Sequence, residues 1–430
     1  MRTCPARSGY GSVMPPGIVS LFRVAVGSLL AAIAIAQSPP SQRVATPPDP
    51  YTRGERAALQ RAGYESLGPF PFAGGQSTTE VADLLGTEPL LWIETAHFRI
   101  GCALSALPLK NGEEWGDEWL ARLKPELERL AKRLPGVKTQ PKELDPWLRA
   151  HLFAQRCEDL YAEALGVLGL PEFHFPVVAD DPADAAKFRG IGPHFGMPNK
   201  FHVLLLRKAS SHARFTRAYQ ESEIADPIRF HDIKAGSMYW GAAEETANGL
   251  FRHDWAVHAH LAFNVAHNLY TCYRSYGHDL PPWLATGLGH WHSRRVSPRF
   301  PTYDRQADHD KDPRSPFWRW DTRVRGLLAN DAFEPFEVLV DRTRSGDFGI
   351  EQHIMSWAVV DWLMKERKPQ TGRFVHLLKD PHHARRRAPT EPELQQRQQE
   401  ALQAAFGQSA QQLGEAWRAS LLPAKSKPKR

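Results

Sequence analysis

Seven histidines lie within residues 251–295, and imidazole is a common zinc ligand. On a helix, His253, His260 and His267 would form one stripe, but successive members would be about 10.5 Å apart along the axis. That is too far for two ligands that each bind one ion at about 2.1 Å. His290 could instead approach His267 from a following helix, with Asp279 or Glu245 as a third ligand. The simpler interpretation is a set of histidines that form hydrogen bonds between packed helices. The seven are His253, His258, His260, His267, His278, His290 and His292.

The same stretch predicts two helices in the layout of a zinc-hydrolase motif. One long helix follows residue 251, and Pro281, Pro282 and Trp283 open a second. In the motif HExxH, two His one helical turn apart point the same way and bind zinc, while the Glu acts as general base. In this frame the five motif positions are 263–267. A third, carboxylate ligand from the second helix would fall at Thr286, with eighteen residues between it and His267.

The residue types at these positions do not support zinc hydrolysis. Phe263 stands at the first ligand position and has no lone pair, and Asn264 stands at the general-base position and cannot accept a proton near neutral pH. Thr286 offers a hydroxyl where a carboxylate is needed, so only His267 keeps its function. The Phe263 ring would fill the space of the ion, and Asn264 would need inward partners, of which Thr286 is the expected one. The sequence therefore predicts a catalytically degenerate site.

Thirteen tryptophans suggest a second kind of site, because an exposed indole can stack on a sugar or hold an extended peptide. The candidates are Trp283, Trp291, Trp318 and Trp320. We expect residues 317–321 to be the most exposed aromatic patch, since they lie in a polar, Pro-rich segment. Trp283 also fits an apolar helical pattern, for which a core position is the simpler interpretation.

The elements that would position these residues follow from periodicity and from capping and breaking residues. Helices are predicted at 52–63, 78–86, 113–134, 145–168, 351–366 and 370–379, with one or two more over 390–421. A strand is predicted at 90–101 with Trp92 and Phe98 on one side, and others at 175–180 and 201–207, the last covered on both faces. Residues 236–241 are expected to form an edge strand.

Four phrases in this order resemble bacterial exported proteins with a gluzincin (HExxH…E) zinc-metallopeptidase-like domain. They are ETAHFRI at 94–100, LPPWLATG at 280–287, SWAVVDWLM at 356–364 and FGQSAQQLGEAWR at 406–418. The resemblance covers roughly residues 90–420. It implies an α+β fold: a zincin-like mixed sheet packed on a long active-site-type helix, followed by a mainly helical lobe. Because Phe263, Asn264 and Thr286 depart from the motif, it does not imply peptidase activity.

The first 36 residues predict an export signal, with three Arg, no acidic residue, a short apolar run and Ala34-Ile35-Ala36 as a cleavage site. We expect the protein to be periplasmic, secreted or on the cell surface. The expected order is a signal at 1–36, a Pro-rich linker at 37–50, a short helical segment at 51–89, the gluzincin-like domain at 90–295, a helical lobe at 296–422 and a basic tail at 423–430. No other membrane span is expected.

The distribution of charge bears on nucleic-acid binding, and the cysteine content bears on the possible disulfides. Lys and Arg number 54 against 48 acidic residues, but the signal holds three of these cations and the last six residues hold four, which leaves the body at about −1. This distribution argues against nucleic acid as a partner. After Cys4 in the signal, Cys102, Cys157 and Cys272 remain, which allows one disulfide or three free thiols.

These features favour an exported, non-catalytic binding or scaffold protein with no cofactor, whose partner is a peptide, a protein or a cell-wall polymer. Two alternatives stay open. One is an active metal-dependent hydrolase with a displaced site, which would need zinc; the other is a protein that binds peptides or glycans on exposed aromatic side chains.

Overall fold

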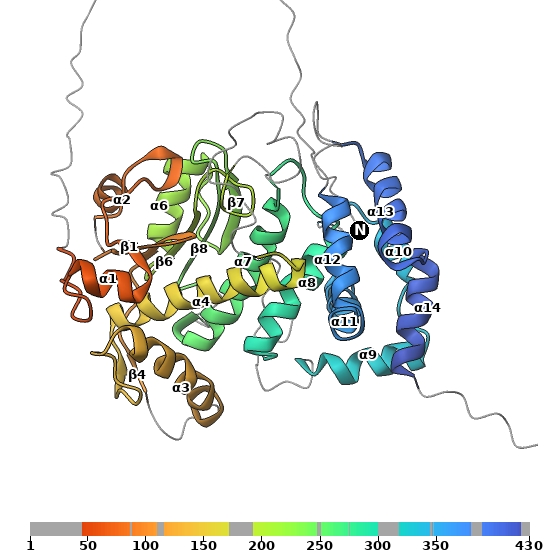
Figure 1. Cartoon of the computed structure of the whole chain (residues 1–430), viewed down its shortest axis with the longest axis horizontal. Helices are drawn as coiled ribbons and strands as arrows, with labels where there is room; N and C mark the ends of the chain where they lie inside the picture. The colour runs from red at the N-terminus through yellow and green to blue at the C-terminus, as the bar shows by residue number, and fades with distance from the viewer. Residues whose placement is uncertain are drawn as a thin grey trace, which may run out of the picture. The chain divides into compact units, whose positions relative to one another are not determined.

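A mixed sheet of six strands forms the centre of the N-terminal part of the chain, with strand order β1-β2-β3-β6-β8-β7 (Figure 1). The computed structural model describes residues 45–86, 88–109, 116–171, 192–246, 251–274, 276–299, 318–344, 346, 348–379 and 389–422. The central strands β3, β6 and β8 run parallel, and β1, β2 and β7 are antiparallel to their neighbours. The strands are β1 (Tyr64–Ser66), β2 (Leu91–Thr95), β3 (Phe98–Cys102), β6 (Phe201–Leu206), β7 (Ile228–Asp232) and β8 (Ser237–Ala243), and β4 (Leu107–Pro108) pairs separately with β5 (Glu143–Leu144).

Helices cover both faces of this sheet and then continue alone to the C-terminal end of the described chain (Figure 1). The predicted α+β class, with a mixed sheet followed by a mainly helical region, is confirmed. The helices are α1 (Arg56–Ala62), α2 (Thr78–Leu85), α3 (Gly116–Arg133), α4 (Pro146–Leu168), α6 (Ala209–Gln220), α7 (Asp254–Cys272), α8 (Pro282–Val296), α9 (Trp320–Ala329), α10 (Phe336–Asp341), α11 (Ile350–Glu366), α12 (Lys368–Leu378), α13 (Glu391–Phe406) and α14 (Ala410–Leu421), with a short 3-10 turn at Ala73–Gly75.

The two faces of the sheet belong to two apolar clusters. On one face Ile93, Ile100 and Val203 pack with α4 and α7 in the larger core, which continues into the C-terminal helices. On the other face Leu204 and Tyr239 pack with α2 and α6 in a smaller core. The prediction that residues 201–207 form a strand covered on both faces is therefore confirmed as β6. Within the described residues, no helix is both long enough and apolar enough to cross a membrane.

Two strand predictions are wrong. Residues 90–101 form a hairpin rather than one strand, so Trp92 and Phe98 lie on opposite faces of the sheet. The turn is closed by Thr95, whose hydroxyl accepts a hydrogen bond from the Phe98 backbone N–H at 3.0 Å. Residues 237–243 form an interior strand, because β7, which the sequence did not predict, lies outside it. The predicted strand at 175–180, the signal, the first part of the linker and the basic tail lie outside the described residues.

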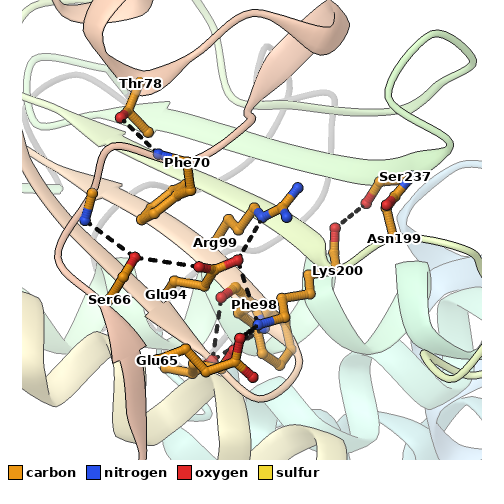
Figure 2. Close-up of polar contacts among 12 residues, drawn as sticks. Glu65, Ser66, Phe70, Thr78, Glu94, Phe98, Arg99, Asn199, Lys200 and Ser237 are labelled. Carbon is orange, nitrogen blue, oxygen red and sulfur yellow. Dashed lines mark hydrogen bonds and ion pairs between the residues drawn. The ribbon is translucent and has the colours of Figure 1, made fainter. Parts of the chain in front are cut away.

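A polar network ties β1 to the sheet (Figure 2). The Glu94 carboxylate accepts hydrogen bonds from Arg99 Nε at 2.9 Å and from Ser66 Oγ at 3.3 Å. Lys200, just before β6, pairs with Glu65 and lies 3.4 Å from the same Glu94 carboxylate. Charged and polar side chains therefore hold the short edge strand β1 against the sheet.

The segments before the sheet and the cysteines also have defined positions. Residues 45–50, the described part of the predicted linker, form neither helix nor strand but pack on α4, where Trp147 Nε1 donates to the Pro47 carbonyl at 2.9 Å. Among the described residues Cys102, Cys157 and Cys272 are all buried free thiols. Of the two possibilities, one disulfide or three free thiols, the structure has the second.

His202 on β6 provides a test of how acid acts on the sheet. Its ring is 1% exposed, has no hydrogen-bond partner at either nitrogen within the described structure, and stacks on Phe72 with centroids 4.7 Å apart. Burial, together with the Arg99 charge, lowers the pKa of His202 to about 3. Below pH 6.5 the unfolded chain therefore binds a proton at this site that the folded chain does not. The free energy of unfolding consequently decreases as the pH is lowered.

We expect this site to cost about 2 kcal/mol of stability between pH 6.5 and 5, at about 1.4 kcal/mol for each pH unit. In His202→Phe the free energy of unfolding, measured by urea denaturation, should fall less over this range by that amount. Equal pH dependence of the wild type and His202→Phe would contradict a neutral, buried imidazole.

Candidate functional site

The two predicted helices around the motif positions are present as α7 and α8. Asp254 lies in the first turn of α7, and Pro282 lies at the first position of α8. A backbone N–H at that position would make no hydrogen bond within the helix, so proline is tolerated there. α8 packs between α7 and α11, and its glycines allow the close approach. A Cβ at Gly287 would lie 2.5 Å from the Ser356 carbonyl of α11, and one at Gly289 would lie 2.9 Å from the Phe263 ring of α7.

Phe263, at the first ligand position of the motif, is part of the packed interface between these helices. Its side chain is 2% exposed, and its ring lies against Gly289 and 4.6 Å from the His290 ring, centroid to centroid. The His267 ring centroid is 6.4 Å away. An apolar ring thus fills the position from which a zinc ligand would extend in the motif.

Asn264, at the general-base position, is buried, and its side-chain amide forms hydrogen bonds with groups other than Thr286. Its Oδ1 accepts a hydrogen bond from Arg229 Nη1 at 2.8 Å, and its Nδ2 donates to the His260 carbonyl at 2.9 Å. The prediction that Thr286 is its partner is therefore wrong. The Arg229 guanidinium also lies 5.8 Å from the centre of the Phe263 ring. A positive charge from β7 consequently stands beside two of the motif positions.

The His267 and His290 rings each lie within hydrogen-bond distance of a different side chain. His267 Nδ1 is 3.4 Å from the Thr271 hydroxyl, and burial together with the Arg229 charge holds the pKa of His267 well below its usual range. His290 Nε2 is 2.9 Å from His353 Nδ1 on α11. Burial likewise lowers the pKa of His290, so both imidazoles are neutral near pH 7.

The ligand sets considered for a displaced metal do not assemble. Glu245 accepts a hydrogen bond from the Ala209 N–H at 3.1 Å, and the Phe263 ring lies against His290. Across the described ranges, no three His, Cys, Asp or Glu side chains are arranged to hold a metal ion.

A cleft of about 900 Å³ lies beside these positions, and both His267 and Thr286 line it. Asp279, from the loop between α7 and α8, lies in the same cleft. Further lining comes from residues 280–282 and Ala285 around the start of α8, from Thr343, Arg344 and Gly346 after α10, and from Leu394 and Gln398 on α13. Two of the four motif-derived positions, one on α7 and one on α8, thus face one groove.

The edge strand β7, next to α7, contributes another part of the cleft lining. Four consecutive residues, 228–231, line the cleft, so the edge of the strand, and not only one of its faces, borders the groove. β7 pairs with β8 on one side only in the described sheet. Phe230 stacks on Tyr239 at 4.5 Å toward the smaller core, and Arg229 extends toward α7. Arg229 was not predicted as a site residue because β7 was not predicted as a strand.

The predicted aromatic patch is buried. Trp318 and Trp320 are 3% and 1% exposed, so the expectation that they form an exposed surface is wrong. The physical reason is packing in the larger core: the Trp320 ring lies 4.9 Å from the His290 ring and 5.7 Å from the Trp357 ring, and the Arg294 guanidinium carbon lies 4.1 Å from its centre. Phe317 lies outside the described residues.

The two other candidate tryptophans are also no part of the cleft wall. Trp283 is fully buried and donates from Nε1 to Gln398 Oε1 at 2.8 Å, as its apolar helical pattern suggested. Trp291 is half-buried, and its ring packs under the Arg295 guanidinium at 4.4 Å. Among the residues that the structure describes, no tryptophan lines the cleft.

Comparison of the chain with protein-family models, with curated proteins and with solved structures gives no significant match.

Proposed function

We propose that this chain is a non-catalytic binding protein built on a metallopeptidase-like scaffold, and that it holds an extended peptide segment in the cleft between β7 and α8. Export is part of the proposal and rests on the sequence of residues 1–36. The resemblance of the two-helix layout supports the scaffold, because His267 and Thr286 line one groove as the aligned motif requires.

The observation that carries the proposal is a groove bordered by a strand edge. A strand that pairs on one side presents backbone N–H and C=O groups to the other side, and an extended peptide can satisfy them as an added strand. In the described sheet β7 pairs only with β8, and its residues 228–231 line the cleft together with the apolar side chains of Met238 and Leu280. The opposite edge, β1, is three residues long and bounded by an ionic network.

The chemistry of the motif positions supports binding without hydrolysis. Phe263 supplies no ligand atom, and Asn264 is already hydrogen-bonded to Arg229. The Arg229 guanidinium also lies beside Asn264 and Phe263, so a cationic group and not a metal ligand stands next to these positions.

Hydrogen exchange measured by mass spectrometry tests the proposal. We expect an alternating threonine–valine hexapeptide at millimolar concentration to slow amide exchange in residues 228–232, because the added strand would pair with the β7 backbone. Exchange in residues 64–66, the other edge of the sheet, should not change. Thr343→Trp, which places a large ring in the cleft, should abolish the effect, whereas Asp341→Trp, two residues away and not in the cleft lining, should not. No protection of β7 by the peptide, or equal protection in Thr343→Trp, would contradict the proposal.

A further inference from the structure

Residues 46–52, just before α1, form a strap that is held on the rest of the molecule through side chains. Its three prolines have no N–H, and no backbone–backbone hydrogen bond joins the strap to α4 or to the described sheet. The Thr46 hydroxyl donates to the Leu90 carbonyl at 3.0 Å, and the other contacts are made with α4. The position of the strap therefore depends on a few identifiable side chains.

The central contact pairs Asp49 of the strap with His151 of α4. Asp49 Oδ1 lies 3.1 Å from His151 Nε2, and neither side chain is exposed to solvent. The other carboxylate oxygen accepts hydrogen bonds from the backbone N–H and the hydroxyl of Thr52. His151 Nδ1 lies 2.9 Å from the Tyr64 hydroxyl of β1. Removing either partner of this pair would leave a buried polar group without its bond.

Three aromatic rings enclose the imidazole and also attach the strap. The His151 ring stacks on those of Tyr64 and Trp147, with centroid distances of 5.4 and 5.7 Å. Tyr51 meets the same ring edge-on at 5.4 Å. Trp147 donates to a strap carbonyl at 2.9 Å, and the Tyr51 hydroxyl donates to the Asp145 carboxylate at the start of α4. The first two turns of α4 thus form the binding surface of the strap.

The other ionisable groups that face the pair are two phenols, one carboxylate and one guanidinium. Burial raises the pKa of Tyr51 and Tyr64, so both phenols stay neutral below pH 7. Arg133 of α3 acts on Tyr64, and its charge opposes that rise. Asp145 is the one further carboxylate that binds the strap directly in the described structure.

Asp49 makes the strap contact sensitive to acid. Burial alone would raise the pKa of Asp49, but its hydrogen bond and electrostatic attraction to His151 outweigh burial and hold the pKa below its usual value. The charged carboxylate therefore favours the bound strap. This contribution is complete above the usual pKa of an aspartate, about 3.9, and is lost as the pH falls through the lower pKa of the bound form.

We propose that the strap is an acid-released latch, in which the Asp49–His151 contact holds residues 46–52 on α4 and protonation of Asp49 lets them swing away. The hinge is the turn at Arg53 and Gly54, whose φ values of 54° and 70° lie in the left-handed region. Of these two residues only the glycine adopts that region without strain.

Release would uncover an aromatic surface. Trp147 is 6% exposed beneath the strap. A second cleft, of about 410 Å³, lies beside it and is lined in part by Pro47 and Pro48 of the strap and by Trp92 of β2. No strap residue lines the cleft between β7 and α8, so the latch does not depend on the proposed peptide binding.

Hydrogen exchange of the full chain at pH 7 tests the latch with Asp49→Asn, which imitates the protonated carboxyl group without acid. Exchange in residues 49–53 should become about ten-fold faster or more, as expected when a hydrogen bond to a charged group is lost. Residues 201–206 of β6 should keep their protection. His151→Phe, which keeps an aromatic ring but offers no bond to the carboxylate, should act in the same direction.

Asp145→Asn is the matched control, because it neutralises the other carboxylate that binds the strap. Asparagine caps a helix as well as aspartate does and can still accept the Tyr51 hydroxyl, so exchange in the strap should change by less than about three-fold. An effect equal to that of Asp49→Asn, or no effect of Asp49→Asn at pH 7, would overturn the proposal.

A pH series gives an independent check. In the wild type, exchange in residues 49–53, corrected for its intrinsic dependence on pH, should increase by about three-fold or more between pH 6 and pH 3. In Asp49→Asn it should not increase further. Simultaneous loss of protection in β6 would mean that acid unfolds the domain as a whole, and the strap would then not be a latch.

Discussion

A variant that carries Phe263→His, Asn264→Glu, Thr286→Glu and Arg229→Met should bind zinc stoichiometrically, although the wild-type chain should not. The two imidazoles at 263 and 267 would lie one helical turn apart on α7 and point the same way. A carboxylate at 286 would face the same groove as His267. Two His and one Glu with an open fourth position is a ligand set that catalytic zinc sites use.

The fourth substitution matters because of the contact between Arg229 and Asn264. With Arg229 present, a glutamate at 264 would pair with the guanidinium, which lies 2.8 Å from the present amide oxygen, and the cation would repel zinc. Two unit charges 4 Å apart interact by about 4 kcal/mol at an effective dielectric constant of 20. The triple variant that keeps Arg229 should therefore bind zinc at least about a hundred-fold more weakly than the quadruple variant.

Zinc content after dialysis, measured by mass spectrometry, and competition with a chelator would check this prediction. The control is the quadruple variant with the added change His267→Ala, which should lose the ion. A quadruple variant that is folded but retains no zinc would mean that positions 263, 267 and 286 are not the motif positions. Equal zinc affinity in the triple and quadruple variants would mean that Arg229 is not the obstacle.

Phe263→Ala should lower the free energy of unfolding by about 3–5 kcal/mol, the usual cost of truncating a buried aromatic ring. The ring is 2% exposed, lies against Gly289 and is 4.6 Å from the His290 ring, centroid to centroid. Gly289→Ala should cost about 1–3 kcal/mol for the opposite reason, because its Cβ would lie 2.9 Å from the Phe263 ring.

The two changes should be coupled. Once the ring is gone, the two closest contacts of the new methyl group, at 2.9 and 3.0 Å, are removed and the Phe263 backbone oxygen stays at 3.1 Å, so the methyl group fills part of the void. The double variant should therefore be more stable than the sum of the single effects predicts, by about 1–2 kcal/mol. Urea denaturation of the four proteins gives this coupling, with Phe263→Leu as a milder control. Strict additivity would contradict direct packing of the ring on α8.

The elements that carry the motif positions could be predicted because their signals are local. The apolar periodicity of residues 254–272 and the prolines at 281 and 282 specify two helices in any context, and they do form α7 and α8. The expectation that Phe263 fills space at the first ligand position agrees with its burial.

The rest of the site depends on contacts between segments far apart in sequence. β7 is a half-buried edge strand of five residues with three polar side chains, a pattern that does not stand out from a loop, and Arg229 was missed with it. Trp320 lies in a polar segment, and its burial depends on contacts with His290 and Arg294 of α8 and with Trp357 of α11. The residues next to each position in the sequence therefore did not indicate its environment. In both cases that environment depends on side chains from another helix or strand.

The fit between Phe263 and Gly289 also limits which residues position 263 can accept. A histidine introduced alone at 263 would leave part of the space over the glycine empty and would face the Arg229 guanidinium, so it would lower stability before any bound ion could compensate. The packing of this helix pair therefore opposes the gain of a metal ligand at this position by a single substitution.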